Sequence, residues 1–244
     1  MPQSCLGPRS LSVNPFEKFN KLLYGGSMKY YYSIFLLILA ISLSCAMPQR
    51  ASAQKTSQGT DFWFGFMDND PEGTVSGYSV FISSDQAASG SISIPLVGWE
   101  QSFTLDANST LLIQIPYDAA YINSSEAVVG KAIHVSTTSP VNVFLMNHGQ
   151  YTTDGSIVLP TSAVGKSYVV TDYPARWKTE FLVVAAQDDS QITIVPTANL
   201  NNGNTAGNSI NIVLNKGELY QVKSNDPLTG SQVYSTNGKV FSVF

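Results

Sequence analysis

Cysteine is nearly absent from this 244-residue chain, which contains only Cys5 and Cys45. Both lie within the first 53 residues, ahead of the stretch that has a globular composition. Residues 54–244 therefore exclude disulfide bonds, cysteine-ligated metal sites and cysteine nucleophiles. Apolar burial and backbone hydrogen bonds must hold this part of the chain together.

Basic residues are also scarce. Residues 1–53 hold five of the 13 lysines and arginines and one of the 17 acidic residues, so residues 54–244 keep 8 basic and 16 acidic residues and a formal net charge of −8. An acidic chain of this kind argues against nucleic acid and anionic membranes as partners.

Long helical periodicity is missing after the first 53 residues, and short apolar stretches bounded by turn-forming residues take its place. This pattern predicts an all-β protein built from antiparallel β-sandwich-like modules. The predicted strands are 78–82, 91–94, 102–105, 111–115, 132–135, 141–145, 181–184, 191–195 and 210–214.

The N-terminal region has the pattern of an export signal. In residues 28–53, Lys29 precedes an apolar run over 34–43, and Ala51-Ser52-Ala53 offers a small-residue cleavage site. Residues 1–27 are predicted to be disordered and to precede the true start at Met28. A retained membrane anchor and a lipid attached at Cys45 are the alternatives. The main prediction is a secreted or cell-surface protein without membrane insertion after signal cleavage.

Residues 54–244 contain an internal similarity. Residues 79–94 resemble 181–194, residues 103–111 resemble 212–219, and residues 130–144 resemble 230–244. The sequence predicts a first β-module over 54–165 and a second, incomplete module over 166–244. The second module ends within its last predicted strand, which leads us to expect a longer polypeptide and an unpaired edge that invites association.

The globular part of the chain begins with a run of aromatic residues. Alternation places Phe62, Phe64 and Phe66 on one face of a strand, as core residues, and Trp63 on the other face, under a loop or exposed. His134 alternates with apolar neighbours, which favours a structural hydrogen bond over a metal site. Asp188-Asp189 is predicted to be a hairpin turn.

Two loops carry the candidate ligand-binding residues. The first contains His148, Tyr151 and Asp154, and Ser156 follows them. A Ser/His/Asp set can be written from these residues, but no Gly-x-Ser-x-Gly elbow is present, so no catalytic residue is predicted. The second loop contains Arg176-Trp177-Lys178, whose positive charge contrasts with the acidic chain. Loop aromatics suit sugar stacking or protein contacts, or they fill the ends of a sandwich.

Asp68, Asp70 and Glu72 form the weak metal candidate. Their carboxylates could hold Ca²⁺, but Pro71 interrupts the loop and the twelfth position is Ser79, not the glutamate of an EF-hand. The interpretation favoured is a solvated acidic turn, with no cofactor and no metal.

Several separated segments resemble the IgGFc-binding protein N-terminal domain of secreted and surface proteins, many from Bacteroidetes-type bacteria. They are 59–67, 132–135 with 139–143, 153–161 and 228–231. The resemblance implies an extracellular adhesion or binding module that recognises a protein or glycan, mucin-like or Fc-like. It transfers no catalytic residue, so the chain is expected not to be an enzyme. Two alternatives remain: a structural spacer in a large surface protein, and a secreted polysaccharide hydrolase, which would need paired carboxylates in a cleft.

Overall fold

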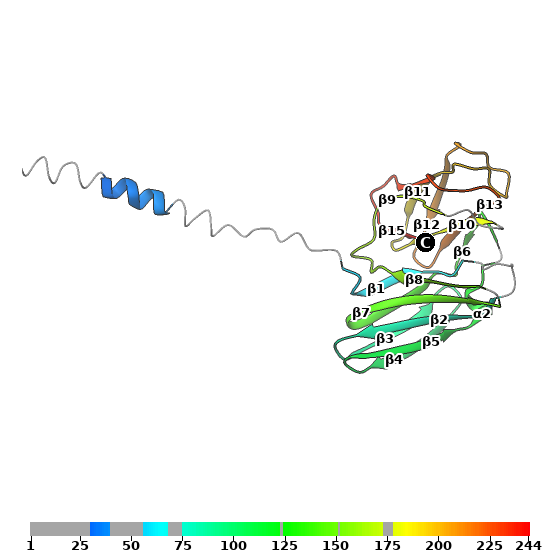
Figure 1. Ribbon diagram of the computed structural model, residues 1–244, viewed down its shortest axis with the longest axis horizontal. Helices are drawn as coiled ribbons and strands as arrows, with labels where there is room; N and C mark the ends of the chain where they lie inside the picture. Colours follow the sequence, from blue (N-terminus) through cyan, green and yellow to red (C-terminus); the bar gives the residue numbers. More distant parts are fainter. Residues whose placement is uncertain (1–29, 40–55, 68–74, 123, 151, 173–177) are drawn as a thin grey trace, which may run out of the picture. The chain divides into compact units, whose positions relative to one another are not determined.

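A computed structural model describes residues 30–39, 56–67, 75–122, 124–150, 152–172 and 178–244 (Figure 1). The chain divides into two compact units, Met1–Ala53 and Gln54–Phe244. The division falls where the sequence predicts signal cleavage, which itself stays a prediction. A helix covers residues 30–39, and its large apolar side chains are exposed. Among the described residues, no helix is both long enough and apolar enough to cross a membrane.

Residues 54–244 are built from antiparallel strands, which confirms the all-β class. In the first half these are β1 (Gly59–Phe64), β2 (Val75–Ser84), β3 (Ala88–Ile94), β4 (Trp99–Leu105), β5 (Ser109–Ile115), β6 (Val128–Val129), β7 (Ile133–Gly149) and β8 (Thr153–Val158), with a one-turn helix, α2 (Tyr117–Ala120). In the second half they are β9 (Ser167–Val169), β10 (Thr179–Ala185), β11 (Ser190–Val195), β12 (Ile210–Leu214), β13 (Leu219–Ser224), β14 (Gln232–Ser235) and β15 (Phe241–Val243).

The long strand β7 belongs to two sheets of the first half. Its first part pairs with β1 and β3, and its second part pairs with β2 and β8. The resulting strand orders are β4-β3-β7-β1 and β5-β2-β7-β8. The prediction of separate strands at 132–135 and 141–145 is therefore wrong, because one strand continues through Ser139-Pro140. Pro140 lacks an N–H and sits where the strand passes between its two sets of partners.

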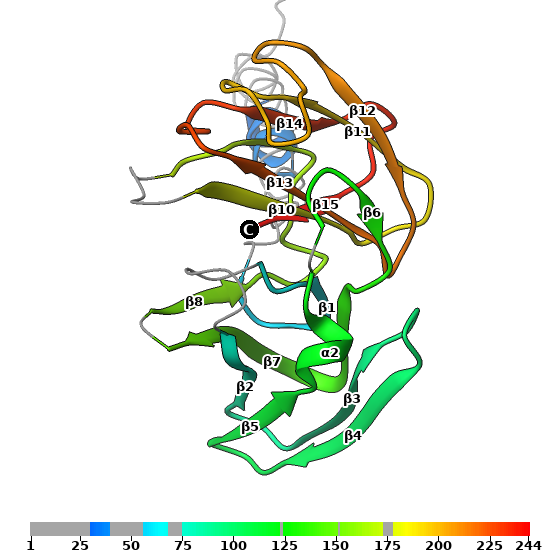
Figure 2. The ribbon, with the colours of Figure 1, turned by 90° about the vertical axis from the view of Figure 1, so that its right-hand side faces the viewer.

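The second half repeats this order of pairing. Strand β10 lies between β13 and β15 as β2 lies between β5 and β7, and β11 lies between β12 and β14 as β3 lies between β4 and β7 (Figure 2). One addition distinguishes it: β6, which precedes β7 in the chain, pairs with the outer edge of β13. The division into two related modules at 165/166 stays a prediction.

Three clusters of buried apolar side chains hold these sheets together. The first fills the first half, the second fills the second half, and the third lies between them. Strand β10 contributes to two clusters, since Phe181 and Val183 face the second and Leu182 and Val184 face the third. A strand buried on both faces needs apolar residues at every position, which is why 181–186 is a continuous apolar run.

Strand β1 supplies both the first core and the third cluster. Phe62, Phe64 and Phe66 are buried in the first core, as predicted. Trp63 faces the other way and is also buried, against Leu182 and Leu219. Neither expected environment of Trp63 is correct, because a second sheet covers the outer face of β1.

Candidate binding surface

Most residues of the predicted recognition loop lie outside the described residues. These residues are Arg176 and Trp177. Tyr151 of the first loop also lies outside the described residues. Lys178 is described; it is exposed and directly precedes β10. Their role in ligand binding stays a prediction.

His148 and Asp154 lie on neighbouring strands but point to opposite faces of their sheet. His148 is paired with Thr153, while Asp154 is paired with Asn147. Paired residues share a face and successive residues alternate, so the imidazole and the carboxylate diverge. The His148 ring hydrogen-bonds with Ser79 Oγ at 3.1 Å, and Asp154 is exposed. This geometry does not form a catalytic triad.

The predicted acidic turn of Asp68, Asp70 and Glu72 also lies outside the described residues. Within the described part of the chain, no group of three or more His, Cys, Asp or Glu residues is placed to hold a metal ion.

His134 has the structural role predicted for it. Its Nε2 lies 2.8 Å from Asp61 Oδ1, and its ring stacks on Trp63 with centroids 4.2 Å apart. Thr161 Oγ1 donates to the other carboxylate oxygen of Asp61 at 2.5 Å. The hydrogen bond from His134 is the main reason that the pKa of Asp61 lies below its ordinary value; burial opposes this shift, and Thr161 adds to it. This cluster joins β1, β7 and the segment after β8.

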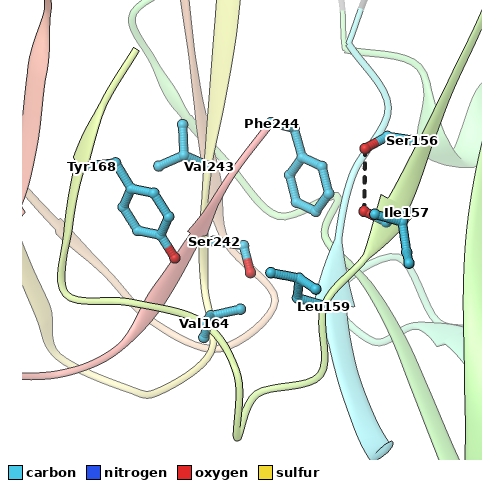
Figure 3. A pocket seen from close by; sticks show the side chains of 8 residues that line it. All are labelled: Ser156, Ile157, Leu159, Val164, Tyr168, Ser242, Val243 and Phe244. Atoms are coloured by element: carbon cyan, nitrogen blue, oxygen red, sulfur yellow. Dashed lines mark hydrogen bonds between the residues drawn. The ribbon is translucent and has the colours of Figure 1, made fainter. Parts of the chain in front are cut away.

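An open groove of about 150 Å³ lies between β8 and β15 (Figure 3). Strand β8 contributes Ser156 and Ile157, and the segment after it contributes Leu159 and Val164. The opposite wall contains Tyr168 of β9 with Ser242, Val243 and Phe244. The groove thus lies where an edge strand of the first half faces an edge strand of the second.

The groove offers apolar contacts rather than acid–base chemistry. Ile157 and Leu159 are 41% and 40% exposed, a large fraction for aliphatic side chains. The Tyr168 hydroxyl is already engaged, since it accepts from the Gly165 N–H at 2.6 Å and donates to the Phe241 carbonyl at 2.7 Å. Burial raises the pKa of Tyr168, so it stays protonated at neutral pH. The described lining includes no side-chain carboxylate, imidazole or amine.

Backbone groups of Val243 point into the same region. Phe244 exchanges two hydrogen bonds with Leu182 of β10, at 2.9 and 3.0 Å. Antiparallel pairing alternates, so the N–H and C=O of Val243, opposite Val183, point away from β10. The sequence did not predict the groove, because the groove forms only where β8 faces β15.

Part of the chain matches a family of known proteins. A family model described as IgGFc binding protein matches residues 154–244, from β8 to the end of the chain. No curated protein and no solved structure matches the chain. The matched segment includes most of 153–161 and all of 228–231, two of the segments in which the sequence resembles this family, and every residue that lines the groove. Over residues 154–244, the chain matches the IgGFc binding protein family.

Proposed function

We propose that this protein is a secreted or cell-surface module that binds an extracellular protein or glycan without changing it chemically. The observation that carries the proposal is the match of residues 154–244 to a family described by a binding activity. The open apolar groove lies wholly within that segment and offers a contact surface. Immunoglobulin Fc and mucin-like glycoproteins are the ligands that the family resemblance suggests.

The Arg176-Trp177-Lys178 loop is the proposed recognition segment. Tryptophan and arginine are enriched among residues that dominate binding energy, and the positive charge would attract acidic ligands to an otherwise acidic chain. His148, Tyr151 and Asp154 are proposed as further contacts at the end of β7 and the start of β8.

A binding array tests this proposal. The purified chain is applied to immobilised mucins, glycans and immunoglobulin Fc, together with the variants Trp177→Ala and Leu112→Ala. Leu112 is a surface residue of β5, 49% exposed, and serves as the control for loss of an exposed apolar side chain. We expect saturable binding that Trp177→Ala weakens and Leu112→Ala preserves. Absence of saturable binding by folded protein to every ligand class would contradict the proposal.

A spacer role is the second candidate, and the third apolar cluster favours it. Buried Trp63, Leu182 and Leu219 connect the two halves without an intervening linker. A rigid pair of sandwiches suits a repeating surface fibre. A folded protein that binds none of the arrayed ligands would favour this alternative.

A further inference from the structure

A row of apolar side chains crosses the outer face of the β5-β2-β7-β8 sheet (Figure 2). Phe81 of β2 is paired with Leu112 of β5 on one side and with Phe144 of β7 on the other, so the three side chains share a face. Val80 and Ile82, the neighbours of Phe81 along β2, are buried in the first core, which places this apolar row on the outside. Leu112 is 49% exposed, Phe144 is 41% exposed, and Phe81 is partly exposed.

Uncharged residues flank the apolar row on both sides. One flanking row consists of Thr110, Ser83 and Asn142, and the other consists of Gln114, Ser79 and Met146. None of the side chains in the three rows is charged, although residues 54–244 hold 16 acidic and 8 basic residues. Exposed apolar side chains with a polar rim are typical of a contact surface.

The absence of charge favours a second copy of this chain as the partner. In a two-fold symmetric contact the same patch is used on both subunits, so a charged side chain near the axis lies close to its own copy and is repelled by it. A face without charges avoids this repulsion. A partner of a different kind, selected by opposite charge, would instead leave carboxylates or ammonium groups on this face.

The order of the rows is also self-complementary. A two-fold axis that runs along the apolar row places this row against its own copy and each flanking row against the other. Ser83 then faces Ser79 of the second copy, and Thr110 faces its Gln114. This axis reverses the strand direction, so the two sheets pack with aligned strands, which is one of the two common ways in which sheets stack.

We propose that the outer face of β5-β2-β7 binds a second copy of the same chain and forms a two-fold symmetric dimer centred on Leu112, Phe81 and Phe144. This inference goes beyond the proposed binding function, because it concerns assembly of the protein rather than its ligand.

The size of the face sets the strength of the dimer. The sheet is about 19 Å wide across four strands and about 23 Å long over the seven residues of β5. Two copies thus bury on the order of 900 Å² of flat face, which is less than the roughly 1,200 Å² of stable complexes. Both copies are acidic, so their net charges repel each other and salt screens this repulsion. The dimer should therefore be weak and should become stronger in salt.

Sedimentation velocity of the full chain tests the proposal, over protein concentrations from about 1 µM to about 1 mM. We expect a reversible equilibrium between monomer and dimer that is tighter at about 1 M than at about 0.1 M salt. A folded chain that stays monomeric at every concentration, or association that salt weakens, would overturn the inference.

Two lysine variants locate the interface. Phe144→Lys places an ammonium group beside its own copy, and we expect at least tenfold weaker dimerisation. Val213→Lys is the matched control, because it makes the same change of charge at an apolar residue of β12 that is 54% exposed. It should leave dimerisation unchanged. Equal loss in both variants would reject this face as the interface.

A third variant covers the case in which Phe144→Lys does not fold. Leu112 is 49% exposed at the other end of the apolar row, so Leu112→Lys also introduces a charge into the interface. We expect it to weaken dimerisation at least tenfold relative to Val213→Lys. Dimerisation equal to that of Val213→Lys would contradict the proposal.

The ligand array separates this inference from the proposed function. Dimerisation of a folded chain that binds no array ligand would support the interface and reject mucin, glycan and Fc as ligands. A chain that stays monomeric, and whose array binding is lost in Phe144→Lys but kept in Val213→Lys, would overturn the dimer and assign the face to the array ligand.

Discussion

The two halves of residues 54–244 share an order of strand pairing but build it from different strands. In the first half, the single long strand β7 pairs with both β2 and β3. In the second half, two short strands take these places, with β15 beside β10 and β14 beside β11. The cores of the two halves are alike in being filled by aliphatic and aromatic side chains. The comparison shows that one order of pairing can be built with one long strand or with two short ones.

The prediction with the largest expected effect tests whether the two halves unfold independently. Phe62→Ala opens a cavity in the first core and Phe181→Ala in the second, and each residue is almost completely buried. Each variant should lose about 3–5 kcal/mol of unfolding free energy. Because the third cluster joins the halves, both variants should lower one common transition in urea unfolding monitored by circular dichroism and tryptophan fluorescence.

Two separable transitions, one affected by each variant, would contradict this coupling. The third cluster would then connect two domains that unfold independently.

The next largest loss of stability is expected for a glycine substitution in the first half. A Cβ at Gly90 would collide with the Ser136 carbonyl and the Thr137 backbone on β7, neither of which can move without breaking the pairing of β3 and β7. Gly90→Ala should cost about 1–3 kcal/mol. Gly77→Ala is the control, since its Cβ would meet only the Gln114 side chain at 3.8 Å. Thermal unfolding measures both, and equal melting temperatures for the two variants would argue against the close approach of β3 to β7.

The strand content could be predicted from sequence, because alternation and turn residues are local signals. Each of the nine predicted segments lies within or overlaps a strand. Three predictions were wrong at positions where contacts with distant parts of the chain determine the structure. The outer face of β1 is covered by β10, so Trp63 is buried. Strand β7 continues through Pro140 because it changes partners there. Asp188-Asp189 connects two sheets and is not a hairpin, since β10 and β11 do not pair.

A smaller effect concerns the Asp61–His134 pair between β1 and β7. The pKa of Asp61 is lowered from 3.8 in the folded chain, chiefly by the hydrogen bond from His134. The stabilisation is therefore present above the ordinary pKa of aspartate and is lost as the pH falls through the folded value. Asp61→Asn should cost about 1 kcal/mol at pH 7. Urea unfolding near pH 3 should show a smaller difference from the parent chain.

A difference between the Asp61→Asn variant and the parent that grows on acidification would contradict this account of the pair. Thr161→Val serves as a control, since it removes the second hydrogen bond to the carboxylate without removing the charge.

The smallest loss of stability is expected for the ion pair at the turn between β10 and β11. Lys239 Nζ is 3.4 Å from Asp189 Oδ2, and both side chains are substantially exposed, 33% and 61%. Exposed ion pairs contribute about 0–1 kcal/mol, and salt screens them. Lys239→Met should change the melting temperature little, and the change should vanish in high salt. A large, salt-insensitive loss would show that the hydrogen bond from Lys239 to the Asp188 carbonyl, 2.7 Å long, matters more than the charge.

The candidate site was less predictable than the fold. The similarity of 130–144 to 230–244 led to the expectation of an incomplete second module with an unpaired final edge, which stays a prediction. The groove could not be predicted, since Ile157 and Val243 are distant in sequence and meet only when β8 and β15 face each other. The alternation of side chains places His148 and Asp154 on opposite faces of the sheet. This could be predicted only if the pairing of β7 with β8 were known.

Amide hydrogen exchange at Ile82 of β2 and Val183 of β10, measured by NMR, tests the comparison most directly. Ile82 pairs with β5 on one side and β7 on the other, and Val183 pairs in the same way with β13 and β15. Both amides should be strongly protected and to a similar degree. Rapid exchange at Val183 while Ile82 stays protected would contradict the shared order of strand pairing.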